Sequence, residues 1–266
     1  MGHLSLRFSF LLLLCTQQAR AQDSLIIIRT EILLDGRGNT LRGMDIIVAN
    51  GKILRVEKSS KAAPAYDLRR LTVMPGWIDT HTHITWHFGP NGHFGEKEET
   101  PEQAVLAAEG NAYATLMAGF TTIQSLGAPE DKALRDAINR GALAGPRILT
   151  AITPITTAKL TPDEIRSEIR KARDGGADVI KIFASGSIRQ GGIQTLNDEQ
   201  LRAACDEAKV LGLRSGVHAY GLAVRGAANA GCTTVEHGTF STQEDLDAMA
   251  SHGTFFDPNV GLVLHN

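Results

Sequence analysis

Four histidines and one lysine in this 266-residue chain have the chemistry of metal ligands. His81 and His83 are two residues apart in "IDTHTHI", a spacing that points both side chains to one face of a β-strand. His218 in "SGVHAYG" and His237 in "TVEHGT" each lie near the carboxyl end of another predicted strand. Imidazole nitrogens that project together from strand ends can hold zinc or a similar divalent ion. The histidines therefore predict a metal site.

Lys181 is the fifth candidate, and its position raises a physical problem. It lies in "GADVIKIFASG", a short β-branched run between glycines that predicts a core strand. A buried, unpaired ammonium group is costly. Two interpretations follow: Lys181 lies at a strand end and extends its charge to water, or it is not an ammonium in the working protein. The residue alone does not decide between them.

The elements that must position these residues alternate after "MPGWIDTHTHI". Helix-start signals occur at Thr100-Pro101, Thr161-Pro162 and Ser241 followed by Glu244. We expect helices near 101–118, 131–141, 161–174, 197–212, 221–230 and 241–252, and strands near 78–84, 119–125, 147–153, 178–184, 214–219, 233–238 and 253–257.

This βα alternation predicts a parallel sheet, and its count favours a TIM-type (βα)8 barrel over an open sheet. Seven strands are expected before Asn266, so the predicted α/β barrel is incomplete. The candidate ligands lie at the carboxyl ends of the strands, where barrels build their active sites.

The segment from Ser24 to about Val73 has a different pattern. Short Ile, Leu and Val runs are separated by Asp35-Gly36, Gly38-Asn39 and Asn50-Gly51, which are turn signals. We expect part of a small β-sandwich over 22–74, followed by the truncated barrel over 75–266.

The first 21 residues have the features of a signal peptide. Arg7 precedes an apolar stretch, and Ala19-Arg20-Ala21 predicts cleavage after Ala21. The apolar stretch is too short to span a bilayer permanently, and Leu14 before Cys15 disfavours lipid attachment. We therefore expect export, to the periplasm or the extracellular space, without a stable membrane anchor.

Composition and cysteine content narrow the function further. The chain is 42% hydrophobic and 21% charged with a formal net charge of −2, which favours a folded core and disfavours nucleic-acid binding. Cleavage would leave Cys205 and Cys232. One disulfide is arithmetically possible, but two buried free thiols are the more ordinary interpretation.

The motifs "VMPGWIDTHTHI", "ADVIKIFASG", "HAYG" and "VEHGT", in this order, resemble the metal-dependent amidohydrolase superfamily. They are most similar to its branch of Xaa-Pro dipeptidases and imidazolonepropionase-like proteins. The resemblance implies two divalent metal ions, with zinc as the expected metal. It implies that His81 and His83 bind the first ion, that His218 and His237 bind the second, and that a carboxylated Lys181 bridges both.

The resemblance also resolves the question of Lys181. Burial lowers the pKa of the amine, so its neutral form can take up carbon dioxide and become a carbamate. A carbamate is anionic and offers two oxygens to two metal ions. The resemblance further implies that a metal-bridging hydroxide attacks an amide carbonyl, with Lys181, His218 and His237 in the catalytic set.

The family's general base is an aspartate at the end of strand 8, and no residue here matches it. Asp257 in "FFDPN" comes about one βα unit too early, and we interpret it as a turn residue. Tyr220 is predicted to face the pocket mouth and bind the substrate carboxylate, with structural packing as the alternative. We do not expect His87 or His93 to be ligands, and we expect Asp79 to fix the first strand.

These observations leave three functional hypotheses. The leading one is a metal-dependent hydrolase of amide bonds in dipeptides or N-acyl amino acids. A lactonase or cyclic-amide hydrolase is the enzymatic alternative, because the same hydroxide attacks esters and rings. The third is a non-catalytic, truncated fragment that lacks the strand-8 base. The expected partner is a small molecule or dipeptide, and a full-length enzyme could also form homo-oligomers.

Overall fold

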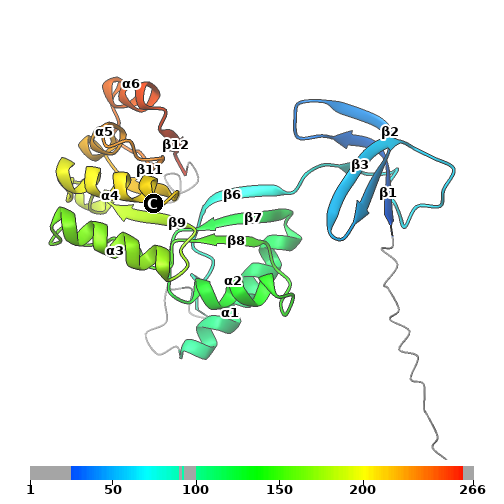
Figure 1. Ribbon diagram of the computed structural model, residues 1–266, viewed down its shortest axis with the longest axis horizontal. Helices are drawn as coiled ribbons and strands as arrows, with labels where there is room; N and C mark the ends of the chain where they lie inside the picture. The colour runs from blue at the N-terminus through cyan, green and yellow to red at the C-terminus, as the bar shows by residue number, and fades with distance from the viewer. Residues whose placement is uncertain (1–24, 90–91, 93–99, 260–266) are drawn as a thin grey trace, which may run out of the picture. The chain divides into compact units, whose positions relative to one another are not determined.

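The computed structural model describes residues 25–89, 92 and 100–259 (Figure 1). The chain divides into two compact units, Met1–Pro75 and Gly76–Asn266. The predicted signal peptide, residues 1–21, lies outside the described residues.

The described residues of the first unit form a five-stranded sheet. Its strands are β1 (Ile26–Leu34), β2 (Thr40–Ala49), β3 (Lys52–Lys58), β4 (Tyr66–Asp67) and β5 (Thr72–Val73). The order is β3-β2-β1-β4, with β5 also paired to β1. Asn50 and Gly51 both have positive φ and close a two-residue hairpin between β2 and β3, as their sequence predicts. The described residues form one sheet here, so a two-sheet sandwich stays a prediction.

Asp45 on β2 is fully buried. The carboxylate of Asp45 accepts hydrogen bonds from Arg29 Nε at 2.7 Å and Arg29 Nη2 at 2.8 Å. The backbone N–H of Ser60 also donates to it, at 2.9 Å. The hydrogen bonds from Arg29 hold the pKa of Asp45 well below its usual range. Asp45 is thus a buried charge with both oxygens in use.

The described residues of the second unit form seven parallel strands. They are β6 (Trp77–Thr82), β7 (Phe120–Ser125), β8 (Arg147–Thr150), β9 (Val179–Phe183), β10 (Arg214–Ala219), β11 (Thr234–His237) and β12 (Phe255–Asp257). β6 to β8 form one sheet and β9 to β12 another, both in chain order. A parallel bridge between Ile155 and Ile182 links the segment after β8 to β9. The α/β alternation is confirmed; the described residues contain no closed barrel, so the barrel stays a prediction.

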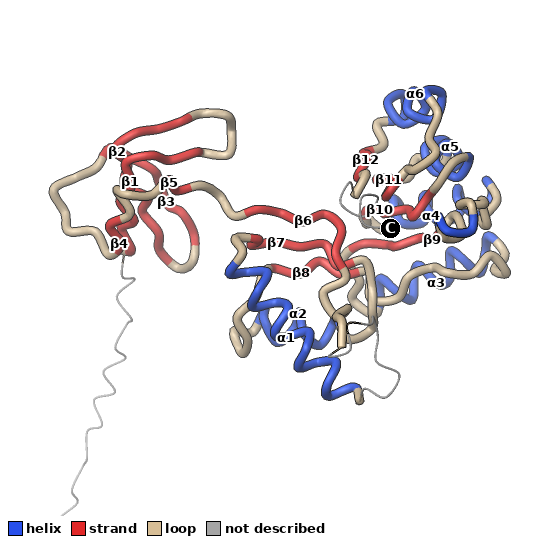
Figure 2. The backbone as a smooth tube through the Cα atoms, turned by 180° about the vertical axis from the view of Figure 1, so that it is seen from behind, coloured by secondary structure: helices blue, strands red, loops and turns tan. Residues whose placement is uncertain are grey.

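Helices follow the strands and pack beside them (Figure 2). They are α1 (Pro101–Met117), α2 (Asp131–Asn139), α3 (Pro162–Asp174), the 3-10 turn η1 (Ile188–Gln190), α4 (Asp198–Val210), α5 (Leu222–Asn229) and α6 (Gln243–His252). Thr100 and Thr161 form the predicted capping boxes. The third prediction was wrong by one residue: Thr242, not Ser241, caps α6, because its partner is Asp245.

The two faces of β9 to β11 have different chemistry. Ile182, Val217 and Val235 are paired across the three strands and belong to the main hydrophobic core, which also contains residues of α3, α4, α5 and α6. Because side chains alternate along a strand, the neighbours of this row project to the other face. His218 is paired with Phe183 on one side and Glu236 on the other. The face away from the helices therefore carries the candidate ligands.

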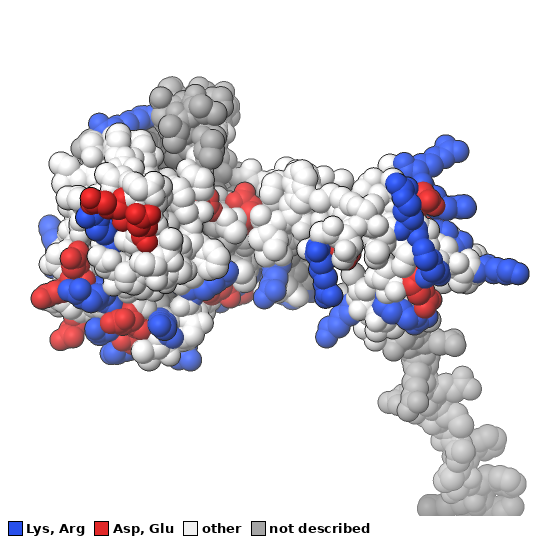
Figure 3. Space-filling model, turned by 90° about the horizontal axis from the view of Figure 1, so that it is seen from above, with Lys and Arg blue, Asp and Glu red and all other residues white. Residues whose placement is uncertain are grey.

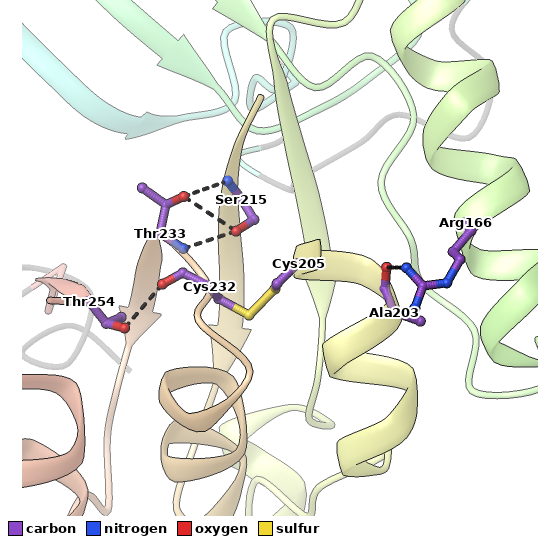
Figure 4. Close-up of a disulfide and its surroundings, with 7 residues drawn as sticks. All are labelled: Arg166, Ala203, Cys205, Ser215, Cys232, Thr233 and Thr254. Carbon is purple, nitrogen blue, oxygen red and sulfur yellow. Dashed lines mark hydrogen bonds between the residues drawn. A yellow bond between two sulfur atoms is a disulfide. The ribbon is translucent and has the colours of Figure 1, made fainter. Parts of the chain in front are cut away.

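The prediction of two free thiols was wrong. Cys205 on α4 and Cys232 before β11 form a disulfide (Figure 4). Their Cα atoms are 5.0 Å apart, within the range that a disulfide requires. Both cysteines are buried, as predicted, but α4 packs where its apolar stripe brings Cys205 against the turn after α5. Packing that is invisible in the linear sequence decided the pairing.

Charge is distributed unevenly over the surface (Figure 3). Lys and Arg outnumber Asp and Glu over residues 25–75, and they gather on the visible face of the first unit. The second unit shows both signs interspersed in the same view. The visible surface of the second unit therefore does not indicate a binding site by its charge. The candidate ligands of this unit are buried or half-buried.

Among the residues that the structure describes, no helix has both the length and the apolar content needed to cross a bilayer.

Candidate metal centre

The structure brings the four predicted histidines together at the carboxyl ends of the strands. His81 is on β6, His83 directly follows it, His218 is on β10 and His237 ends β11. Ring centroids are 5.6 Å apart for His81 and His83, and 4.9 Å apart for His81 and His237. His218 and His237 are 4.8 Å apart. Side chains from three separate strands thus form one cluster.

Lys181 on β9 is buried, with 1% of its surface exposed. The interpretation that it extends to water is therefore wrong. Its Nζ atom is 5.2 Å from the ring centroid of Phe183 and has no hydrogen-bond partner in the described part of the chain. Burial lowers the pKa of Lys181 to about 8, although the charges of Glu236 and Asp257 oppose the shift. A lysine with this pKa is neutral in about one molecule in ten at pH 7.

Burial also lowers the pKa of three of the histidines. Desolvation lowers the pKa of His83 to about 3 and that of His218 to about 4, with the charge of Lys181 adding to both shifts. The pKa of His237 is lowered further, first by desolvation and then by its charged neighbours. A neutral imidazole has a free lone pair, which is the form that binds metals.

His237 reaches the cluster through an unusual backbone conformation. Its φ is +72°, in the left-handed region that few residues other than glycine adopt. Alternation along β11 would direct Glu236 and His237 to opposite faces. The positive φ at the end of the strand reorients the chain there, and His237 faces His81 and His218. Strain of this kind collects at functional sites.

Glu236 is the residue that the sequence interpretation missed. It is fully buried, and its Oε2 lies 2.7 Å from Nδ1 of His81. Its other oxygen, Oε1, is buried without a hydrogen-bond partner among the described residues. The only signal in the sequence was an acid directly before a candidate ligand in "VEHGT".

The nitrogen atoms of the four histidines and Lys181 are suitable ligands for divalent cations, although the side chains do not converge on one point. Over residues 25–89, 92 and 100–259, no three His, Cys, Asp or Glu side chains have converged as a metal site. Buried polar atoms normally have partners, yet His83 Nδ1, His237 Nδ1 and Lys181 Nζ have none within this described part. Neutral nitrogens and one amine, left unpaired in a cluster, are the chemistry that a cation would satisfy.

A cavity of about 620 Å³ opens beside the cluster. Tyr220 lies on its wall, with its ring 4.8 Å from His218 and 5.6 Å from His237. The predicted contact of Tyr220 with substrate stays a prediction. Further residues of the wall carry hydroxyl groups or an ammonium: Thr156, Thr157, Ser185, Ser187, Thr195 and Lys159.

The remaining candidates have structural partners. The carboxylate of Asp79 accepts a hydrogen bond from the backbone N–H of His81 at 2.9 Å, in agreement with a role in fixing the first strand. Asp257 accepts from the hydroxyl of Thr80. His87 Nδ1 lies 3.2 Å from its own loop, at the carbonyl of Thr85. His93 lies outside the described residues.

The second unit thus combines parallel βα units with a cluster of imidazoles at the ends of its strands. Residues 72–265 match the amidohydrolase family model, and the chain belongs to that family. The predicted superfamily is therefore confirmed.

Similar proteins place the chain within the family. A solved Xaa-Pro dipeptidase with methionine bound in its active site superposes with a TM-score of 0.82 at 28% identity, over 90% of this chain and 67% of that one. Ochratoxinase from Aspergillus niger is 23% identical over 283 residues, 86% of this chain and 58% of the relative. The structural relatives are thus Xaa-Pro dipeptidases and related amidohydrolases, as the motifs predicted. The chain spans about half the length of a matching Mycobacterium tuberculosis protein, which is 28% identical.

Proposed function

We propose that the protein is a metal-dependent hydrolase of amide bonds that acts on Xaa-Pro dipeptides or N-acyl amino acids. The observation that carries the proposal is the cluster of buried, unpartnered nitrogen atoms at the strand ends in the described residues. The family match and the similarity to a solved Xaa-Pro dipeptidase support the bond type.

The histidines have the chemistry to hold two divalent cations, with zinc as the proposed metal. His81 and His83 would hold one ion, and His218 and His237 the other. Such ions supply Lewis-acid activation of water and of the scissile carbonyl. The protein's own contribution is to lower the pKa of His83, His218 and His237 by burial and to hold the four rings at the ends of three strands.

Lys181 is proposed to act as a carbamate. The neutral amine attacks the carbon of CO2, a C–N bond forms, and the nitrogen loses one proton to solvent. The product is an anion with two oxygens in place of a cation among histidines. The burial of Nζ and its lack of a partner within the described residues support this assignment.

The cavity supports a small, polar substrate. A volume of about 620 Å³ is adequate for a dipeptide or an acylated amino acid. The hydroxyl of Tyr220, together with Ser185 and the Lys159 ammonium on the same wall, is proposed to bind the substrate carboxylate. The scissile amide would then lie toward His218, which also lines the cavity.

Export is part of the proposal. The signal-peptide pattern of residues 1–21 and the Cys205–Cys232 disulfide both favour an oxidising compartment. An exported hydrolase would meet nutrient peptides.

A substrate panel tests the proposal. The protein is loaded with Zn²⁺ and assayed on Xaa-Pro dipeptides, N-acyl amino acids, cyclic amides and lactones. We expect hydrolysis of the first two classes and its loss after chelation. Exclusive turnover of lactones or cyclic amides would replace the proposed substrate class. Metal content, measured on the same samples, distinguishes a chain that binds metal without turnover from one that binds none, and the second result contradicts the proposal.

A further inference from the structure

The contact between Glu236 and His81 joins a buried acid to a candidate ligand. Both side chains are almost inaccessible: the side chain of His81 is 8% exposed and that of Glu236 is fully buried. Oε2 of Glu236 and Nδ1 of His81 are 2.7 Å apart, a short, charge-assisted hydrogen bond. Glu236 comes from β11 and His81 from β6, so the contact crosses the inside of the unit rather than following one sheet.

Hydrogen-bond chemistry fixes the direction of this contact. An ionised carboxylate only accepts, so the hydrogen must be on Nδ1 of His81. In a neutral imidazole the other nitrogen, Nε2, then has the free lone pair. His81 differs in this respect from His83 and His237, whose Nδ1 atoms have no partner in the described residues. Glu236 thus determines the tautomer of one ring in the cluster.

We propose that Glu236 is a positioning residue, whose carboxylate holds the His81 ring by Nδ1 and presents a more basic Nε2 to the metal centre. This inference rests on the proposed function. A carboxylate behind a ligating histidine fixes the orientation of the ring and increases its basicity, and loss of such a partner lowers metal affinity about 10- to 100-fold.

A glycine on the adjacent strand makes room for the carboxylate. A Cβ atom added to Gly216 of β10 would lie 3.1 Å from Oε1 of Glu236 and 3.7 Å from Leu126. Gly216 is paired with Lys181 and with Thr234, in the middle of β10. The missing side chain at position 216 therefore leaves space that the carboxylate uses, on the residue that is paired with Lys181.

The second unit contains a matched acid with a structural role. Glu207 on α4 is nearly buried and accepts two hydrogen bonds from Arg170, at 2.7 and 3.1 Å. This pair lies between α3 and α4, on the helix side of the strands. Glu207→Gln therefore removes a nearly buried charge from an ion pair without touching the cluster, and it serves as the control.

The test measures Zn²⁺ affinity by chelator competition in the wild type, Glu236→Gln, Glu207→Gln and His81→Ala. We expect Glu236→Gln to raise the dissociation constant of one of the two Zn²⁺ ions, the one held by His81, about 10- to 100-fold. The Zn²⁺ affinity of Glu207→Gln should equal that of the wild type. Affinity of Glu236→Gln equal to the wild type would overturn the inference. Loss of one bound ion per chain, as expected for His81→Ala, would also overturn it, because Glu236 would then be a ligand. A wild type that binds no Zn²⁺ would contradict the proposed function itself.

Two further measurements exclude a merely structural role. In metal-free protein, nitrogen NMR of His81 should show hydrogen on Nδ1 in the wild type and a shift toward hydrogen on Nε2 in Glu236→Gln. Gly216→Ala keeps every charge but displaces the carboxylate, so we expect a smaller fall in Zn²⁺ affinity than in Glu236→Gln. An unchanged tautomer in Glu236→Gln would contradict the inference even if the affinity fell.

Discussion

Two fully buried carboxylates show how the two units of this protein treat charge. Both carboxylate oxygens of Asp45 in the first unit accept hydrogen bonds. Arg29 donates from two nitrogens, and Ser60 donates its backbone N–H. Glu236 in the second unit uses one oxygen for His81 and leaves the other without a partner in the described chain. Lys181, whose pKa responds to Glu236, also has an unpartnered Nζ there.

The difference separates a structural charge from a functional one. A satisfied buried ion pair stabilises the fold or costs little, whereas an unsatisfied buried polar group is costly. The second unit retains several such groups at one place, where the strands end. An arrangement that costs stability is retained when it binds something, and here the donors match a divalent cation.

The largest expected effect comes from Lys181. Lys181→Met keeps an unbranched, apolar side chain that is one atom shorter and removes the amine. Hydrolysis should fall by at least about 1,000-fold, because several kcal/mol of metal-supplied catalysis is lost. The free energy of unfolding of the metal-free protein should not fall, since the amine has no partner to lose within the described residues. Peptidase assays and urea denaturation measure the two quantities.

Lys171→Met is the matched control for that variant. Lys171 is on α3 and pairs with Glu168 on the surface. It should leave hydrolysis unchanged. If Lys181→Met were as active as this control, or much less stable than the wild type, Lys181 would belong with the structural charges.

The Cys205–Cys232 disulfide of the second unit should contribute to stability and not to metal binding. Replacing Cys205 and Cys232 by alanine opens a loop with a sequence separation of 27, which should cost about 3.5 kcal/mol of unfolding free energy by chain entropy. Zn²⁺ affinity of the folded fraction should not change. Thermal unfolding of metal-free protein with and without reductant checks the stability, and an equal Tm under both conditions would refute the prediction.

Asp45→Asn tests the structural member of the comparison. It removes the charge that pairs with Arg29, and we expect the first unit to lose about 3 kcal/mol of stability. Hydrogen–deuterium exchange of the amides in β1 and β2 reports this loss directly. Exchange as slow as in the wild type would show that the pair is not structural.

Lowering the pH should also reduce the stability of the first unit, by a smaller amount and gradually. The folded-state pKa of Asp45 is depressed, so its contribution is present above the unfolded pKa of about 4 and is lost as the pH falls below that value. The protection factors of the amides in β1 and β2, which correct for the pH dependence of intrinsic exchange, should fall between about pH 5 and pH 2 in the wild type. The corresponding slope should be flatter in Asp45→Asn, and parallel slopes would contradict the assignment.

Much of the scaffold and the ligand set could be predicted from local sequence. The βα rhythm placed the helices within a few residues, because caps and apolar stripes are local signals. The positions of His81, His83, His218 and His237 followed from strand ends, which meet at one edge of parallel strands. The β-branched neighbours of Lys181 predicted a core strand at that point, but they left open whether its side chain extends to water.

What could not be predicted depends on contacts between distant segments. Glu236 precedes His237, so strand alternation alone gave no reason to place both in one cluster; the positive φ of His237 resolves this. The Cys205–Cys232 pairing depends on how α4 packs against the turn before β11. A single sequence predicts neither the positive φ of His237 nor the packing of α4.

The number of zinc ions per chain tests the central claim most directly. Metal analysis after Zn²⁺ loading and dialysis should find two ions in the wild type and fewer in His83→Ala and His237→Ala, whose Nδ1 atoms lack partners in the described structure. A wild type without bound zinc, or histidine variants that bind as much as the wild type, would contradict the claim that these unpaired buried atoms exist to hold metal.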